Sequence, residues 1–216
     1  MYMYTLPIDY PYDQGPRSAS NSYVRVLHAS PDAPAVDIYV DGKLIVKNLS
    51  YKQLTNYIPV KPGSYKIQIF AAGQQMNPVI STTATIPAQS ALTLAAIGTL
   101  SNIELMAISE VYMPTNIAQK SFIRFVHLSP NAPAVDIVND NGTKLFENVS
   151  YKTYTNYIAV APGRYTLMVK PTGTDQTVLT IPNVHLMSGM LYSIYAVGLV
   201  GGKPPLEAII SVDGNY

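Results

Sequence analysis

The chain has 216 residues, no cysteine and a formal net charge of +1, and only 12% of its residues are charged, about half the ~25% of an ordinary globular domain. This length suits one large domain or two small ones of about 100 residues each. The absence of cysteine excludes disulfides, thiolate metal sites and cysteine nucleophiles, and a chain without a basic field is a poor partner for nucleic acid. A surface with so little charge has weak repulsion between molecules, which favours association.

Residues 1–21, "MYMYTLPIDYPYDQGPRSASN", form a segment in which tyrosine and proline alternate. It contains neither a basic region nor an apolar stretch, so it does not read as a secretory signal. No run in the chain approaches the ~18 apolar residues of a membrane span. Two interpretations of the segment stay open. It is a solvated leader, or it is a docking strand that joins neighbouring molecules or anchors the chain to a surface layer.

Residues 22–111 are predicted to form short β-strands throughout. In "SYVRVLH" the side chains of Val24, Val26 and His28 alternate with those of Tyr23, Arg25 and Leu27, which is the period of a strand. The segments "VDIYV" and "KLIV" flank Asp41-Gly42, a dipeptide favoured in tight hairpins because both turn residues need positive φ. Further strands are expected at 54–60, 64–71, 79–86, 91–98 and 103–111. About eight strands at this spacing indicate a β-sandwich.

Residues 121–216 repeat this pattern after a linker at 112–120. "YVRVLHASPDAPAVDI" (23–38) aligns with "FIRFVHLSPNAPAVDI" (122–137) at an offset of 99, and "NLSYKQLTNYIPVKPGSYKI" (48–67) aligns with "NVSYKTYTNYIAVAPGRYTL" (148–167) at an offset of 100. In the second copy Asn141-Gly142 replaces Asp41-Gly42. A period near 100 residues is the size of a domain, so the chain is a tandem duplication. The expected fold is all-β, with two tandem sandwiches that touch because the linker is short.

The two motifs together resemble a known family. "HxSPxAPxVDI" followed by "SYKxxTNYIxVxPGxY" is similar to the bacterial domain of unknown function 4397, over roughly 22–111 and 121–213. The resemblance implies an immunoglobulin-like or transthyretin-like β-sandwich, often in tandem, on exported proteins. It therefore implies an extracellular, cell-surface or spore-surface location, with the cytoplasm as the alternative because no leader is seen. It implies no activity and no cofactor.

The opening loop of each copy contains the residue types of a hydrolase triad. They are His28, Ser30 and Asp37 in the first copy, and His127, Ser129 and Asp136 in the second. A triad needs the serine beside the histidine and an oxyanion hole of preorganised donors. Pro31 follows Ser30 and has no backbone donor. A catalytic role is therefore not expected.

A metal site in this loop would use His28, Asp32 and Asp37. The second copy has Asn131 in place of Asp32, which removes a charge from the ligand set. One histidine with one or two carboxylates is also a sparse set for zinc or calcium. No metal is expected.

An architectural role explains these residues better. His28 and His127 are expected to lie at the ends of core-facing rows and to bond loop backbone that would otherwise lack a partner. The prolines of the loop stiffen the crossover because each fixes its own φ; they are Pro31, Pro34, Pro130 and Pro133. Asp37 and Asp136 lie on the outer side, where they accept loop amides or pair with Arg25 and Arg124.

Four tyrosines of the second motif allow two interpretations; they are Tyr57, Tyr65, Tyr157 and Tyr165. A tyrosine after a Pro-Gly turn commonly fixes a sandwich corner through its hydroxyl, whereas exposed tyrosines can stack on sugar rings. The sequence therefore favours a non-enzymatic structural or surface-interaction protein that associates with itself or with a surface layer. The alternative is a module that binds glycan or peptide.

Overall fold

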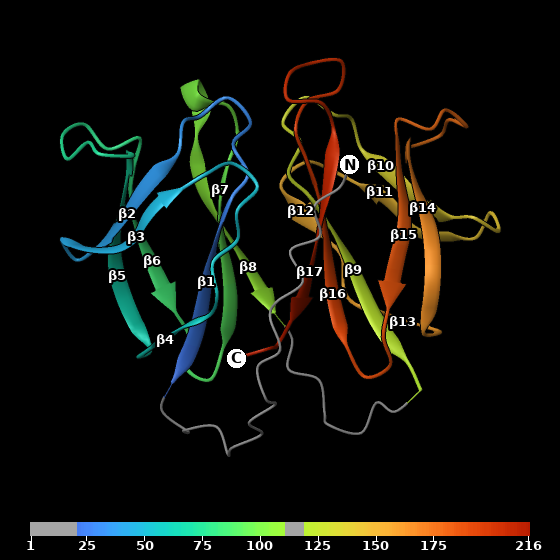
Figure 1. The fold of residues 1–216 in the computed structure, drawn as a ribbon, viewed down its shortest axis with the longest axis horizontal. Coiled ribbons are helices and arrows are strands. Elements are labelled where there is room, and N and C mark those ends of the chain that lie inside the picture. The colour runs from blue at the N-terminus through green and yellow to red at the C-terminus, as the bar shows by residue number, and fades with distance from the viewer. Residues whose placement is uncertain (1–20, 111–118) are drawn as a thin grey trace.

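The computed structural model describes residues 21–110 and 119–216, and these fold into two β-sandwiches (Figure 1). The first sandwich contains β1 to β8 and the second contains β9 to β17, and no sheet is shared between them. The prediction of two tandem β-sandwiches is confirmed. The predicted tail at 1–21 and the linker at 112–120 lie almost entirely outside the described residues.

The first sandwich has two four-stranded sheets. One has the order β4 (Ile58–Val60), β1 (Ser22–His28), β7 (Ala91–Ile97) and β8 (Glu104–Glu110). The other has the order β3 (Lys43–Leu49), β2 (Val36–Val40), β5 (Gly63–Ala71) and β6 (Ile80–Ile86). Strand β1 runs parallel to β7, and the other pairs are antiparallel.

The strand expected at 54–60 is shorter than predicted. Only β4 forms a ladder with β1, and Leu54 makes a single bridge to Leu27. Between them the Thr55 hydroxyl accepts the amide of Val26 at 2.9 Å, so a side chain replaces the backbone partner at that point.

The second sandwich repeats this arrangement. One sheet contains β9 (Ser121–His127), β16 (Leu191–Val197) and β17 (Glu207–Asp213), with the short strands β12 (Thr153–Tyr154) and β13 (Ile158–Val160) both paired to β9. The other has the order β11 (Lys144–Val149), β10 (Val135–Asn139), β14 (Gly163–Pro171) and β15 (Leu179–Leu186). Strands β9 and β16 are parallel, as β1 and β7 are.

The two equivalent hairpins differ in their turns. Asp41 and Gly42 both have positive φ, 48° and 78°, as the sequence predicted. In the second copy only Gly142 is left-handed, with φ 85°. The loop there has one more residue, and Asn141 instead accepts the backbone amide and the hydroxyl of Thr143 through its side chain.

A third hydrophobic cluster lies between the two sandwiches, in addition to their own cores. The first copy contributes Leu27, Ala29, Ala95, Ile97 and Ile108, and the second contributes Val126, Leu128, Tyr195 and Val197. The sheets that contain β1 and β9 are therefore covered on both faces, and the molecule has four β-layers (Figure 1). This explains why every residue of β7, "ALTLAAI", is buried, since a strand covered on both faces is apolar without alternation.

Within the described ranges, no helix has the length and apolarity needed to cross a membrane.

Candidate functional site

The two sandwiches contact each other through reciprocal pairs of residues. Arg25 Nη1 donates to the carbonyl of Val212 at 2.9 Å, and Arg124 Nη1 donates to the carbonyl of Ser109 at 2.5 Å. Ser109 and Val212 are equivalent positions, because each pairs with the second residue of the preceding strand. Arg25 of the first copy thus contacts the second copy at the position equivalent to the one where Arg124 of the second copy contacts the first. Such reciprocal contacts are the mark of an interface with two-fold symmetry.

The same symmetry appears in ion pairs at one edge of the interface. Lys52 of the first sandwich pairs with Glu207 of the second at 2.8 Å. Lys152 of the second pairs with Glu104 of the first. The two copies are therefore related by a pseudo-two-fold axis.

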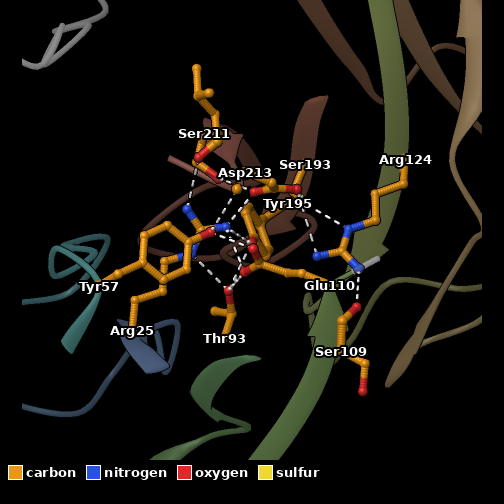
Figure 2. Close-up of polar contacts among 12 residues, drawn as sticks. Arg25, Tyr57, Thr93, Ser109, Glu110, Arg124, Ser193, Tyr195, Ser211 and Asp213 are labelled. Carbon is orange, nitrogen blue, oxygen red and sulfur yellow. Dashed lines mark hydrogen bonds and ion pairs between the residues drawn. The ribbon is translucent and has the colours of Figure 1, made fainter. Parts of the chain in front are cut away.

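Four charged side chains are buried at this interface, and we call Arg25, Glu110, Arg124 and Asp213 the interface quartet (Figure 2). Arg25 pairs with Asp213 across the interface and with Glu110 of its own sandwich at 3.1 Å. Arg124 Nη2 lies 3.6 Å from Asp213 Oδ2. Two positive and two negative groups balance, which is the condition for tolerating charge in a medium of low dielectric constant.

Hydroxyl groups connect the members of the quartet. Arg25 Nε donates to Thr93 Oγ1 at 2.8 Å, and Thr93 donates to Glu110 at 2.7 Å. In the second copy Arg124 Nε donates to Ser193 Oγ at 2.6 Å, and Ser193 donates to Asp213. Thr93 and Ser193 are equivalent positions on β7 and β16. Each sandwich therefore builds the same arginine–hydroxyl–carboxylate chain.

Tyr57 and Tyr157 cover this cluster. Their rings lie over the guanidinium groups of Arg25 and Arg124, each at 4.7 Å from ring centroid to Cζ. The Tyr57 hydroxyl donates to Glu110 and the Tyr157 hydroxyl donates to Asp213 at 2.5 Å. Burial raises the pKa of both hydroxyls, so both remain protonated donors. These two tyrosines are not available to stack on a sugar.

One residue breaks the symmetry. Tyr195 occupies the position that Ala95 has in the first copy, and its hydroxyl accepts Arg25 Nη2 at 3.2 Å. No equivalent hydroxyl reaches Arg124, whose Nη2 makes no hydrogen bond within the described part of the chain. The two arginines thus have unequal environments.

The loop histidines bond to backbone. His28 Nε2 lies 2.9 Å from the carbonyl of Pro34, and His127 Nε2 lies 3.0 Å from the carbonyl of Pro133. Because a carbonyl only accepts, Nε2 carries the proton in both rings. Both side chains are fully buried, and burial lowers the pKa of each imidazole. Their Nδ1 atoms have no hydrogen-bond partner among the described residues.

The loop serines and prolines complete the crossover. Ser129 Oγ donates to the carbonyl of Gly198 at 2.7 Å, whereas the buried Ser30 Oγ has no partner in the described ranges. Pro31 and Pro130 lie in the turns that follow. Asp32 accepts the amide of Leu100 at 2.8 Å, so it faces the next loop and not the histidine.

Asp37 and Asp136 bind loop amides, which is one of the two roles left open by the sequence. Asp37 accepts the amides of Gly73 at 2.9 Å and Asn48 at 2.7 Å, and these hydrogen bonds lower its pKa. Asp136 accepts the amide of Asn148 at 2.8 Å and pairs with Lys144 at 2.8 Å. The alternative pairing with Arg25 and Arg124 is wrong, because both arginines belong to the interface quartet.

Neither a triad nor a metal site is assembled from the loop residues. The ring of His28 and the carboxylate of Asp37 bond to different backbone groups, as described above. No group of three His, Cys, Asp or Glu side chains in residues 21–110 and 119–216 is placed to hold a metal ion.

Tyr65 and Tyr165 lie at sandwich corners. The Tyr65 hydroxyl donates to the carbonyl of Lys61 and the Tyr165 hydroxyl donates to that of Ala161, both at 2.7 Å. Each tyrosine thereby fixes the turn four residues upstream of itself. The four tyrosines of the second motif therefore divide into two corner residues and two interface residues.

A cleft of about 250 Å³ lies where the two sandwiches meet at their loop ends. Gly98, Thr99 and Asn102 line it from the first copy, and Pro130, Asn131, Tyr151 and Lys152 line it from the second. Tyr151 is partly exposed. Asn131 is held in place because its amide group bonds twice to the backbone of Val200, at 2.9 and 3.0 Å.

Three solved structures show distant similarity to the chain. The TIE protein of Bacillus anthracis is 11% identical, with a TM-score of 0.28 over 84% of this chain and 34% of that one. A leucine-rich repeat protein from Bacteroides thetaiotaomicron is 12% identical, with a TM-score of 0.23 over 84% of this chain and 26% of that one. The chain thus spans about a third and a quarter of their lengths.

A carbohydrate-binding module of family 26 from Eubacterium rectale Amy13K, solved in complex with maltoheptaose, is 9% identical, with a TM-score of 0.27 over 88% of this chain and 96% of that one. Similarity at this level supports no functional assignment. Comparison with curated protein sequences gives no match.

The family comparison gives a clear result. The model of the domain of unknown function DUF4397 matches residues 22–138 and 138–215. The boundary at 138 falls within β10, so the matched segments do not coincide with the two sandwiches. Together they cover both repeats, and the chain therefore belongs to the DUF4397 family, of which it carries two tandem copies.

Proposed function

We propose that this chain is a non-enzymatic structural or surface-interaction protein, in which two DUF4397 repeats act as one rigid unit on a cell or spore surface. The observation that carries the proposal is the buried interface between the repeats. It joins a shared hydrophobic cluster with a charge-balanced quartet, and both are of the kind found inside a domain. Interfaces that allow domains to move are ordinarily smaller and more polar.

The bonding partners of the repeated polar residues support the same structural role. The arginines and Tyr57 and Tyr157 connect the two sandwiches, while the histidines, Asp37 and Asp136 hold loops within each one. These residues build the fold and leave its outer sheets as the surfaces that meet partners. A surface of Ser, Thr and Tyr with little charge suits contact with other copies or with a surface layer.

The test is whether the full chain associates with itself. Sedimentation measures this over a concentration series from low micromolar upward. We expect reversible assembly that persists in high salt, because it does not depend on charge. In parallel, chromogenic esters, phosphates and glycosides are offered to the chain and to its His28→Ala/His127→Ala variant, and both should give the same background. A chain that stays monomeric, or turnover that this variant loses, contradicts the proposal.

Glycan binding is a second candidate, and the loop-end cleft favours it. A partly exposed tyrosine ring beside amide and hydroxyl groups is a suitable surface for a sugar ring. Tyr51 is the equivalent residue of the first copy. It does not line the cleft, so it is a matched control.

On a glycan array, we expect any bound sugar to be lost in Tyr151→Ala and kept in Tyr51→Ala. The two changes remove the same side chain from equivalent positions beside a lysine, so their effects on stability are comparable. Equal retention or equal loss of binding in both variants argues against the cleft. A peptide array scored in the same way decides between glycan and peptide.

A further inference from the structure

Nearly every strand at a sheet edge has a feature that discourages pairing with another chain. Unprotected edges expose a row of backbone groups to which a foreign strand can bind, and short strands, charges, prolines and bulges prevent this. Strands β4, β12 and β13 have two or three residues. Strands β8 and β17 each begin with a glutamate outside the interface quartet, Glu104 and Glu207. Strands β3 and β11 contain lysine and a shift of register.

Strand β6 has none of these features. Its sequence, "ISTTATI", contains no charge and no proline, and it pairs with β5 over its whole length without a shift of register. Four of its seven residues are exposed; they are Ser81, Thr82, Thr83 and Thr85. Threonine and isoleucine favour the strand conformation. Within the described ranges, β6 is thus a long, uninterrupted and uncharged edge.

The equivalent strand of the second copy is protected. In β15, Ile181 and Val184 pair with Leu167 and Tyr165, as Thr82 and Ala84 of β6 pair with Ile67 and Tyr65. The pair Pro182-Asn183 therefore occupies the place of Thr83 alone. Pro182 has no amide to donate, and Asn183 is left-handed with φ 57°, so the ladder is interrupted. Of the two equivalent edges, that of β15 is therefore protected against strand addition and that of β6 is not.

A groove beside β6 provides room for side chains of an added strand. It has a volume of about 190 Å³ and lies between β6 and the apolar residues Leu94, Leu105 and Ala107 of the facing sheet. Strand addition uses backbone hydrogen bonds for affinity and such side-chain pockets for selectivity. A strand with aromatic residues at every second position would place one ring in this groove, because alternate side chains share a face.

Residues 1–6, "MYMYTL", have this pattern. They contain Tyr2 and Tyr4 at alternate positions, no charge and no proline. The chain that leads to them starts close to β6, because Ser22 Oγ donates to the carbonyl of Pro87, the residue that follows β6, at 2.6 Å. The 21 residues before Ser22 have a reach of roughly 70 Å at about 3.3 Å per residue, against roughly 23 Å for the length of β6.

We propose that residues 1–6 of a neighbouring copy add as a strand to the free edge of β6. Pro7, Pro11 and Pro16 lie between residues 1–6 and β1, and because proline favours extended backbone, the connection is long enough for residues 1–6 to reach another molecule. The inference rests on the proposed association and names the two surfaces that meet. Each molecule offers one donor segment and one acceptor edge, so the assembly grows head to tail.

The experiment uses four full-length chains. The edge variant has Thr83 replaced by a Pro-Asn pair, which copies the natural sequence of β15. The tail variant carries Tyr2→Pro and Tyr4→Pro, which remove two backbone donors from the segment. The control, Thr83→Val, keeps an uncharged strand former at the edge. Sedimentation over a concentration series, with melting curves to check the fold, compares all three with the unmodified chain.

We expect the unmodified chain and Thr83→Val to associate, and each of the other variants alone to associate at least tenfold more weakly. The decisive sample is an equimolar mixture of the edge variant and the tail variant. One has an intact donor and the other an intact acceptor, so the mixture should form one-to-one dimers and stop there. If the edge variant unfolds, Thr83→Glu takes its place, because Glu at 83 lies opposite Lys66 and charges the edge without a clash.

Other occupants of the edge give different results. If β6 pairs with β6 of a second copy, the tail variant associates like the unmodified chain. If residues 1–6 cover their own β6, the chain is monomeric while β6 amides are protected from hydrogen exchange and lose that protection in the tail variant. Either result overturns the inference. Association that the edge variant retains also overturns it but leaves the proposed function standing, whereas a monomer with unprotected β6 amides refutes both.

Discussion

The loop histidines show how a buried polar side chain makes stability depend on pH. His28 and His127 are neutral in the folded chain, and burial holds the pKa of each below the ordinary 6.5. In the unfolded chain both rings regain that value. As the pH falls below about 6.5, the unfolded state therefore binds protons that the folded state does not, and the free energy of unfolding decreases. Above that pH the histidines make no such difference.

We expect the unmodified chain to lose stability between about pH 7 and pH 5, above the range where Asp37 and Asp136 titrate. The His28→Ala/His127→Ala variant should lose this slope. Each substitution should also lower the free energy of unfolding by about 1–3 kcal/mol at pH 8, because a buried proline carbonyl loses its donor. Urea titrations at several pH values measure both effects.

His185→Ala is the matched control, because His185 is exposed on β15. It should keep the pH slope of the unmodified chain. Unchanged stability in the double variant would contradict the structural role of the loop histidines.

Sequence reasoning located the polar residues of the fold better than it located their partners. The spacing of Val24, Val26 and His28 indicates which side chains share a face of β1. The same pattern assigns Arg25 and Leu27 to the opposite face, which appears solvent-facing in an isolated sandwich. They are buried because the second copy covers that face, and alternation within one strand carries no information about such a cover.

The duplication made the strands easy to predict from the sequence, but it hid one pair of equivalent residues. Repeated motifs identified the strands of both copies, including the strand at 91–98, but not that this strand is covered on both faces. Glu110 and Asp213 were missed as a pair because the loop before β17 is three residues longer than the loop before β8, so their offset is 103 and not 100. Strand pairing restores the equivalence, since Glu110 lies opposite Ala91 and Asp213 opposite Leu191.

The difference between β6 and β15 is visible in the sequence, but its effect on edge protection can be predicted only once the order of strands in the sheets is known. The sequence of β15, "LTIPNVHL", is one residue longer than that of β6, "ISTTATI", and it contains a proline. Only the topology shows that both lie at edges, where a proline protects and a threonine does not. Local patterns thus predict the strand, whereas its neighbours decide its exposure.

For the whole molecule, the shared cluster and the interface quartet predict cooperative unfolding. The sandwiches should melt in a single calorimetric transition, because separating them exposes the residues between β7 and β16 and the buried charges. In Asp213→Ala, Arg25 and Arg124 stay buried without their shared carboxylate. Removing one partner of a buried ion pair typically lowers stability by about 3–5 kcal/mol.

We therefore expect two separate transitions in Asp213→Ala, measured by differential scanning calorimetry. Lys52→Ala serves as the comparison, because it breaks an exposed ion pair of the same interface and should leave one transition. A single transition at nearly the original temperature in Asp213→Ala would show that the apolar cluster alone holds the sandwiches together.

The pseudo-two-fold interface also has a consequence for how the two halves vary. In a dimer of identical chains, every substitution at the axis appears twice, and dilution separates the subunits. Here both halves belong to one polypeptide, so their contact does not depend on concentration and each side of the axis accepts its own residue. Tyr195 and Ala95 are equivalent positions within the shared cluster, and identical subunits would have to carry the same residue at both. Because both repeats are encoded in one chain, two equivalent interface positions can carry different residues, which is impossible in a homodimer.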